Sequence, residues 1–492
     1  MTAIPFDNSY ARLPEAFYTR LDPTPVSDPA LIAVNRPLAL QLGVDPDWLA
    51  SDDGVKVIAG NAVPEGAEPL ASVYAGHQFG SYNPQLGDGR AILLGEVVDD
   101  RGNRYDIQLK GSGPTPYSRG GDGRSPLGPV LREYIVSEAM HALGVPTTRS
   151  LAAVTTGEQV VREEFLPGAV LARVASSHIR IGTFQYFAAR NDTDALQRLV
   201  RHVLVRHYPD MLDSDNRGLA LLESVIARQA SLVASWQLLG FIHGVMNTDN
   251  MLLSGETIDY GPCAFMDDFG ADKVFSSIDH GGRYAYRNQP GIAHWNLACL
   301  AQCLLPLLHE DKDRAVELAQ ESIDRFPDLF LQAHTRGMAR KLGLQEIGEP
   351  DTPLVEELFQ LMDQHRLDFT LTFRRLADLA DETSASSVPM GELFEIPDAL
   401  LPWLARWRER LQREETPTTQ RQATMYAANP AFIPRNHLVE ETIQAATHEQ
   451  DLVPFFKLLE VLEAPYEYRP TDSRFATPPR PEQEVRQTFC GT

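Results

Sequence analysis

The segment HGVMNTDNMLLSGETIDYG, residues 243–261, carries the most informative chemistry in the chain. It contains Asn250, and Asp259 follows nine residues later. Side-chain oxygens of asparagine and aspartate are hard ligands, of the kind that suits Mg²⁺ when the ion bridges phosphates. Two short apolar runs flank a turn at Gly255-Glu256, which predicts a β-hairpin that delivers Asp259 to a metal-binding position.

The same segment matches the residue order of a protein-kinase catalytic loop, H-R-D-L-x-x-x-N, which precedes a hairpin that ends in D-F-G. Aligned without gaps, His243 matches the histidine and Asn250 matches the metal-binding asparagine. The usual catalytic base falls on Val245, which cannot accept a proton. An aspartate stands instead at Asp249. Either phosphoryl transfer is lost, or a different group is transferred with Asp249 as the base.

A second candidate for the metal-binding aspartate lies further along the chain. Asp268-Phe269-Gly270 spells the kinase tripeptide itself, but it lies 18 residues past Asn250. Because a hairpin this tight ends at Asp259, we prefer Asp259 and keep Asp268 as the alternative. For the whole segment, the alternative is a buried hairpin whose polar groups are satisfied without a ligand.

Upstream residues supply the parts of a phosphate site. Gly87-Asp88-Gly89-Arg90 stands at the start of a strand, where closely spaced glycines let backbone N–H groups approach a phosphate. Lys110 ends the strand pattern YDIQLK in a chain with 38 Arg and only six Lys. A lysine can act as a point charge on nucleotide phosphates. A plain turn and a solvated lysine at a strand end are the alternatives.

A carboxylate on the next predicted helix, residues 129–143, would hold Lys110 toward phosphate. Glu133 and Glu138 are both candidates, and the hydrophobic periodicity does not decide between them.

Hydrophobic patterning predicts an α+β protein with a β-rich front lobe, a larger helical lobe and an extension at each end. We expect residues 1–60 to form the N-terminal extension, with a helix around 29–43. Residues 61–170 form the β-rich lobe, 171–415 the helical lobe and 416–492 a C-terminal extension that wraps the surface.

Composition limits the class of protein. The 492 residues carry 44 Lys and Arg against 67 Asp and Glu, a formal net charge of −23, which argues against a general nucleic-acid binder. No run of 18 apolar residues predicts a membrane helix. The N-terminus lacks the patterns of a signal or transit peptide, so we expect a cytoplasmic protein.

The four cysteines are too few for a disulfide scaffold, and none forms a C-x-x-C pair. Cys299 and Cys303 lie four apart in an apolar run, and we expect them on one face of a buried helix. Cys490 is third from the C-terminus on a polar tail, where we expect an exposed thiol.

Taken together, these motifs resemble the selenoprotein O (SelO/YdiU) family of kinase-like proteins, over nearly the whole chain. The stretches that carry the resemblance are FDNSYARLP (6–14), YAGHQFG (74–80), LGDGRA (86–91), QLKGSG (108–113), TPYSRGGDGR (115–124), LREYIVSEAM (131–140), RVASSHIRIGTF (173–184), HGVMNTDNM (243–251) and IDYGP (258–262). The resemblance implies a protein-kinase-like bilobal fold.

The resemblance also implies that ATP binds in an orientation flipped relative to ordinary kinases, so that the α-phosphate faces the acceptor. The implied reaction transfers AMP from ATP to Ser, Thr or Tyr hydroxyls of proteins and releases pyrophosphate, with Mg²⁺ (or Mn²⁺) as the cofactor. UMP transfer from UTP with Mn²⁺ is a variant. The competing functions are a conventional kinase that uses Asp268 and a nucleotide-binding pseudokinase scaffold.

The resemblance assigns roles to residues. Asp249 resembles the general base, Asn250 and Asp259 the metal ligands, and Lys110 the phosphate-contacting lysine. Glu133 is implied to hold Lys110, because Glu133 is the acid of the REY motif. The nucleotide contacts that the family implies are Gly87, Gly89, Arg90, Lys110, Asp122, Gly123, Arg173, Arg180 and Asp259.

Arg173 and Arg180 are implied to clamp the buried terminal phosphate. Spaced seven apart, they would share one face if the segment is helical. A guanidinium fork is a good partner for a buried phosphate.

The implied partners are ATP and protein substrates, with redox-related proteins as the suggested class. We expect no nucleic acid, no membrane, and a monomer in a bacterial cytoplasm.

Cys490 stands where animal members carry selenocysteine and many bacterial members carry cysteine. In bacterial relatives that residue can pair with a cysteine after the D-Y-G motif. Residues 274–284 hold none, which argues against a redox latch and leaves Cys263 as the only nearby partner.

Overall fold

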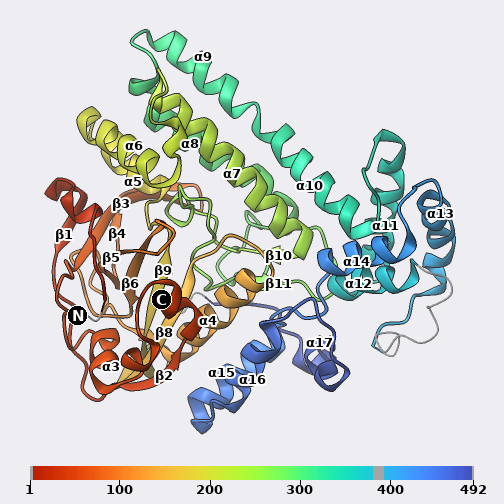
Figure 1. The fold of residues 1–492 in the computed structure, drawn as a ribbon, viewed down its shortest axis with the longest axis horizontal. Helices are drawn as coiled ribbons and strands as arrows, with labels where there is room; N and C mark the ends of the chain where they lie inside the picture. Colours follow the sequence, from red (N-terminus) through yellow and green to blue (C-terminus); the bar gives the residue numbers. More distant parts are fainter. Residues whose placement is uncertain (1–3, 381–392, 490–492) are drawn as a thin grey trace.

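The structure is a computed structural model that describes residues 4–380 and 393–489. A β-sheet region built from the first part of the chain lies beside a larger helical region, and the last helices, α15 to α17, lie at the bottom centre of the view in Figure 1. The predicted α+β order, with a β-rich region first and helices after it, is confirmed, and the structure shows that the sheet is antiparallel.

Nine strands of the described residues form one sheet. They are β1 (Tyr18–Arg20), β2 (Ala30–Val34), β3 (Leu70–Gln78), β4 (Ser81–Gly87), β5 (Ala91–Val98), β6 (Arg104–Lys110), β7 (Ser125–Pro126), β8 (Arg149–Val161) and β9 (Phe165–Ala175). The main order is β1-β3-β5-β6-β9-β8-β2, with β4 paired to β3 and β7 to β9, all antiparallel. The hairpin predicted from alternation is confirmed, because β5 pairs with β6 and Ala91 lies opposite Lys110.

The first 60 residues contribute to this sheet. The helix expected around 29–43 is wrong in its first half, because Ala30–Val34 is strand β2 and pairs with β8. Helix α1 (Arg36–Gln41) begins only after Asn35, whose side chain accepts a hydrogen bond from Leu38 N. A branched, apolar run next to an open sheet edge gains more from pairing than from helical periodicity.

The remaining helices build the other layers. They are α2 (Pro46–Leu49), α3 (Asp52–Ala59), α4 (Leu127–Ala142), α5 (Ile181–Ala188), α6 (Thr193–His207), α7 (Arg217–Leu239), α8 (Gln289–Leu308), α9 (Lys312–Ile323), α10 (Phe326–Leu342), α11 (Thr352–Gln364), α12 (Phe369–Leu379), α13 (Leu401–Leu411), α14 (Thr418–Ala428), α15 (Asn436–Gln444), α16 (Val453–Leu462) and α17 (Ser473–Ala476). The helix expected at 129–143 is α4, which packs on β8 and β9. The expected lobe boundary at 170/171 falls inside β9.

Helix α8 confirms the expectation for two cysteines, since Cys299 and Cys303 are buried in it. By length and composition alone, the helical stretch Tyr286–Leu308 is apolar enough to cross a membrane. Half of its most apolar part is buried, and α8 packs against α5, α7 and α9. This is weak evidence for a membrane span, because a core helix passes the same test.

The C-terminal residues do more than wrap the surface. Helices continue to Ala476, and α15 and α16 pack on α4. Phe432 and Phe455 are fully buried in the same cluster as Leu131 of α4. The expected surface extension is therefore partly core. Cys490, for which we expected an exposed thiol, lies outside the described residues.

Candidate functional site

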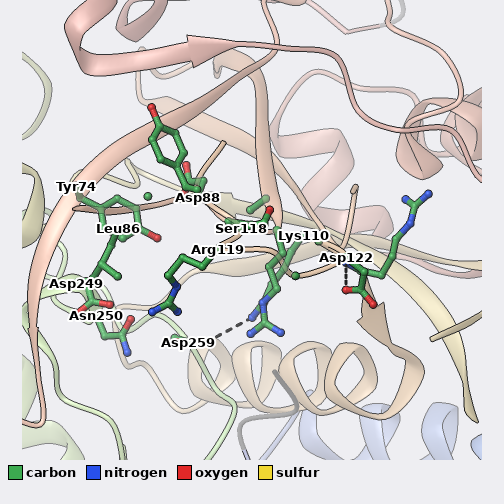
Figure 2. A pocket seen from close by; sticks show the side chains of 18 of the residues that line it. Tyr74, Leu86, Asp88, Lys110, Ser118, Arg119, Asp122, Asp249, Asn250 and Asp259 are labelled. Carbon is green, nitrogen blue, oxygen red and sulfur yellow. Dashed lines mark hydrogen bonds and ion pairs between the residues drawn. The ribbon is translucent and has the colours of Figure 1, made fainter. Parts of the chain in front are cut away.

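The family resemblance implies roles for twelve residues: the nucleotide contacts, the metal ligands, the general base and the carboxylate that holds Lys110. Eleven of these twelve line one cavity of about 270 Å³. Its lining includes Gly87, Gly89, Arg90, Lys110, Asp122, Gly123, Arg173, Arg180, Asp249, Asn250 and Asp259. In the view of Figure 2, Asp249 and Asn250 lie together at one side and Asp122 lies at the other. The twelfth residue, Glu133, stands behind Lys110 and does not line the cavity.

The β-hairpin predicted to turn at Gly255-Glu256 is wrong, because its two halves do not pair with each other. Leu252 bridges to Arg180, and Thr257 bridges to Thr147, so each half pairs with another part of the chain. Asp259 nevertheless reaches the cavity, and its φ of +71° is left-handed. Aspartate and asparagine tolerate this conformation better than other residues with a Cβ. The backbone at position 259 therefore has a conformation that an aspartate can adopt at low cost.

The Asp259 carboxylate faces several positive charges. Its Oδ1 lies 3.5 Å from Lys110 Nζ. Burial alone would raise the pKa of Asp259, but Lys110, Arg90 and Arg173 outweigh it and hold this pKa well below its usual range. Asp259 is therefore a permanent carboxylate on the cavity wall.

Asp268, the alternative, lies outside this cavity. Its carboxylate accepts a hydrogen bond from Lys273 and, at 3.0 Å, from Arg366 Nε. Those cations already balance its charge. The cavity offers Asp259, and not Asp268, to a ligand.

Lys110 is held at the wall of the cavity by Glu133. Nζ of Lys110 donates to Glu133 Oε2, and Arg173 Nη1 lies 3.1 Å from Glu133 Oε1. Burial alone would raise the pKa of Glu133. The positive charges of Lys110 and Arg173 outweigh burial, so the pKa of Glu133 lies below its usual value. The other candidate, Glu138, instead binds Arg149 at 2.6 and 2.9 Å.

Arg173 and Arg180 reach the cavity from different elements. Arg173 is on strand β9 and Arg180 precedes helix α5, so the conditional expectation of one helical face is not met. Arg173 Nη2 donates to Gln108 Oε1 at 2.6 Å, and Arg180 Nη1 donates to the backbone oxygen of Asp249 at 2.7 Å. The Nε atoms of both arginines are buried without a hydrogen-bond partner among the described residues. Since such donors are costly to leave unpaired, they fit an anionic ligand.

Asp249 is buried, and one of its carboxylate oxygens lacks a hydrogen-bond partner among the described residues. Gln78 Nε2 donates to its Oδ2 at 3.1 Å, whereas Oδ1 has no hydrogen-bond partner within the part of the chain described. Burial raises the pKa of Asp249 to about 6, although the charge of Arg180 opposes the shift. A carboxylate with a pKa near neutrality and an unpaired oxygen can accept a proton from a hydroxyl.

Asn250 is oriented by a backbone group. Its Nδ2 donates to Val245 O at 2.9 Å, which leaves the amide oxygen available for a ligand. The described residues hold no group of three or more His, Cys, Asp or Glu that could bind a metal ion. Asn250 and Asp259 therefore fit Mg²⁺ as a partial set of oxygen ligands, of the kind that phosphate oxygens complete.

The glycine turn packs against a second loop. A Cβ on Gly87 would lie 2.4 Å from the Tyr117 ring, and one on Gly89 would lie 2.8 Å from Tyr117 O. The glycines thus allow two loops to meet at the mouth of the cavity. Asp122, on the second loop, binds Arg162 at 2.8 Å.

Several lining residues were given no role of their own from the sequence. They are Tyr74, Gln78, Leu86, Asp88, Ala91, Tyr117, Ser118, Arg119, Gly121, Arg124 and Arg162. Most of them lie within the stretches YAGHQFG, LGDGRA and TPYSRGGDGR, so the motifs marked the region without separating its members.

Comparison with known proteins gives a consistent result. Residues 1–463 match the family model described as protein adenylyltransferase SelO. The chain is 60% identical over 488 residues to the protein nucleotidyltransferase YdiU of Bradyrhizobium sp. (strain BTAi1 / ATCC BAA-1182), with 99% of each chain covered. It is 59% identical over 492 residues to the protein of the same name from Rhizobium meliloti (strain 1021), with 100% of each chain covered.

Proposed function

Because the chain belongs to the protein adenylyltransferase SelO family and is a protein nucleotidyltransferase, we propose that it transfers AMP from ATP to Ser, Thr or Tyr hydroxyls of proteins. The observation that carries the proposal is the buried Oδ1 of Asp249, which has no hydrogen-bond partner among the described residues, beside Asn250 in a loop whose usual base position is Val245. An acceptor hydroxyl needs such a base beside the phosphate that it attacks.

The nucleotide binds with its terminal phosphates inward. The inner wall carries Arg173 and Arg180, which are 3% and 6% exposed and have unpaired Nε donors. The most charged end of a triphosphate gains most from buried guanidinium groups. In this flipped orientation the α-phosphate lies nearest the outside, where an acceptor can reach it.

The remaining contacts divide by chemistry. Lys110, held by Glu133, and Arg90 supply positive charge to the phosphates, and Asn250 and Asp259 hold Mg²⁺ (or Mn²⁺). When bound there, the ion would neutralise charge on the phosphate oxygens. The loop residues that complete the nucleotide site are Gly87, Gly89, Asp122 and Gly123.

The reaction then needs one proton transfer. The acceptor hydroxyl gives its proton to Asp249 Oδ1, and its oxygen forms a bond to the α-phosphorus. The bond from that phosphorus to the bridging oxygen breaks, and pyrophosphate leaves with that oxygen. Gln78 holds the other oxygen of Asp249, which leaves Oδ1 as the carboxylate oxygen without a partner among the described residues.

The expectations for fold, location, oligomeric state and acceptor class belong to the same proposal. We assign the two regions to the lobes of a protein-kinase-like bilobal fold, and we place the protein in the bacterial cytoplasm as a monomer. Its acceptors are proteins, with redox-related proteins as the first class to examine.

Paired label transfer tests the proposal. The protein is given Mg²⁺ with α-labelled ATP, with γ-labelled ATP, or with α-labelled UTP and Mn²⁺, and label in protein is measured. Incorporation from α-labelled ATP alone is the expected result. Incorporation from the γ-label would return the protein to the kinases, and bound ATP without incorporation would indicate a pseudokinase scaffold.

Glu133 gives a second test of the site. We expect Glu133→Gln to lower the turnover of AMP transfer about 10- to 100-fold, because Lys110 and Arg173 lose the group that orients them. Glu138→Gln is the matched control on the same helix, since its partner is Arg149. Turnover and ATP affinity are measured for both variants. Equal losses of turnover would contradict a specific role for Glu133.

A further inference from the structure

The surface beside Asp249 carries an arginine without an ionic partner. No Asp or Glu carboxylate of the described residues lies within 4.0 Å of the Arg283 guanidinium, and its buried Nε has no hydrogen-bond partner there. The guanidinium instead lies 4.9 Å from the ring centre of Trp295 and 5.8 Å from that of Tyr284, whose hydroxyl is its neutral neighbour. Asp279, close in sequence, is buried and binds the backbone N–H groups of Arg283 and Tyr284. An arginine stacked on an aromatic ring keeps its edge free for a carboxylate.

The tip of the β3–β4 hairpin contacts Arg283 on one side and, through Gln78, the base on the other. A Cβ on Gly80, at this tip, would lie 3.5 Å from the Arg283 guanidinium. Two residues earlier, Gln78 donates to Asp249. One short turn of backbone therefore links the unpaired cation to the carboxylate that accepts the proton.

A second link runs through Asn247. Its Oδ1 accepts hydrogen bonds from Phe79 N at 3.0 Å and from the Tyr284 hydroxyl at 2.6 Å. The residue after Arg283 is thus tied to the loop that carries Asp249. The position of Arg283 relative to the base is set by structure on both sides.

An aromatic rim continues from Arg283. Trp295 and Tyr82 are 37% and 41% exposed, and the His77 ring lies between them, 5.2 and 4.9 Å from their ring centres. Burial lowers the pKa of His77, so the imidazole is neutral at pH 7. Arg190 adds positive charge near Tyr82. The rim is therefore apolar and cationic.

We propose that this surface, formed by His77, Tyr82, Arg283 and Trp295, docks the acceptor segment of the protein substrate, and that Arg283 binds an Asp or Glu next to the acceptor hydroxyl. The inference rests on the proposed function and names its substrate class. A chain with a net charge of −23 repels acidic partners at long range, so selection of an acidic segment requires a local unpaired cation. The exposed rings supply contact area at low entropic cost.

The test uses the full chain, α-labelled ATP and two sets of synthetic peptides. Each peptide has one Ser, Thr or Tyr acceptor, flanked either by Asp and Glu or by Lys. We expect the acidic set to be labelled about 10-fold more efficiently, as for one partly buried charge pair. Arg283→Ala should reduce the preference below about 2-fold, and Arg283→Glu should reverse it toward the Lys-flanked set. Arg287→Ala, an exposed arginine paired with Asp272, is the matched control and should keep it.

The outcomes separate this inference from the function beneath it. Equal labelling of both sets by the wild type, a preference that survives Arg283→Ala, or label confined to the enzyme itself would each overturn the docking surface alone. No label in peptide or enzyme, with ATP bound, would overturn the proposed function. The ATP dissociation constants of the Arg283 variants report on folding, and a reversed preference in Arg283→Glu cannot arise from misfolding.

Discussion

Asp249→Asn is expected to lower AMP transfer by about 10²- to 10⁴-fold, the range for loss of a general base, while ATP stays bound. Asparagine keeps the size of the side chain and an oxygen for Gln78, but it cannot accept the hydroxyl proton. Arg180 contacts the backbone oxygen of residue 249, so the phosphate-binding wall is unchanged by the substitution. Single-turnover transfer from α-labelled ATP and the ATP dissociation constant are the measurements.

The pH dependence gives this prediction a second readout. Burial raises the pKa of Asp249 to about 6, so the base is protonated and inactive below that pH and becomes active as the pH rises through it. A divalent cation bound nearby would favour the carboxylate, and saturating Mg²⁺ should move this acid limb to lower pH. The residual activity of Asp249→Asn should lack the limb. A variant that keeps the limb, or that keeps wild-type turnover, would rule out Asp249 as the base.

The candidate site was more predictable from the sequence than the backbone that builds it. The sequence motifs pointed to four residues that suit a phosphate and metal site, and their side chains meet in one cavity. They are Lys110, Asp249, Asn250 and Asp259. The hairpin that was to deliver Asp259 does not form as predicted, because its halves pair with residues far away in the chain. The residue types and their spacing in a motif indicate which chemistry a site can perform. Which segments of backbone pair with each other depends on the whole fold.

Periodicity could not choose between Glu133 and Glu138, because α4 is buried around most of its circumference. The choice depends on Arg149 and Arg173, which come from strands β8 and β9. Gln78 left no local signal either, since its partner Asp249 lies 171 residues away. Long-range contacts of this kind are not visible in a single sequence without its fold.

Asp259→Asn is the second large effect that we expect. The carboxylate is one of two proposed metal ligands, and its loss should reduce transfer at least about 10³-fold, or about 4 kcal/mol of transition-state stabilisation. Asparagine is the appropriate replacement because residue 259 has a φ of +71°, which asparagine tolerates and alanine does not. The variant therefore removes charge without straining the chain. Transfer is measured across a Mg²⁺ titration, and binding of ATP without metal should persist, because Arg173 and Arg180 are untouched.

Asp268→Asn is the matched control for this substitution. Asp268 pairs with Lys273 and with the exposed Arg366, so its replacement should cost about 1 kcal/mol of stability or less and leave transfer intact. The opposite pattern, in which Asp268→Asn abolishes transfer and Asp259→Asn does not, would move the metal to the D-F-G sequence and restore the kinase interpretation. A partial loss in Asp259→Asn that high Mg²⁺ reverses would still identify Asp259 as a ligand, because weaker metal binding is overcome by mass action.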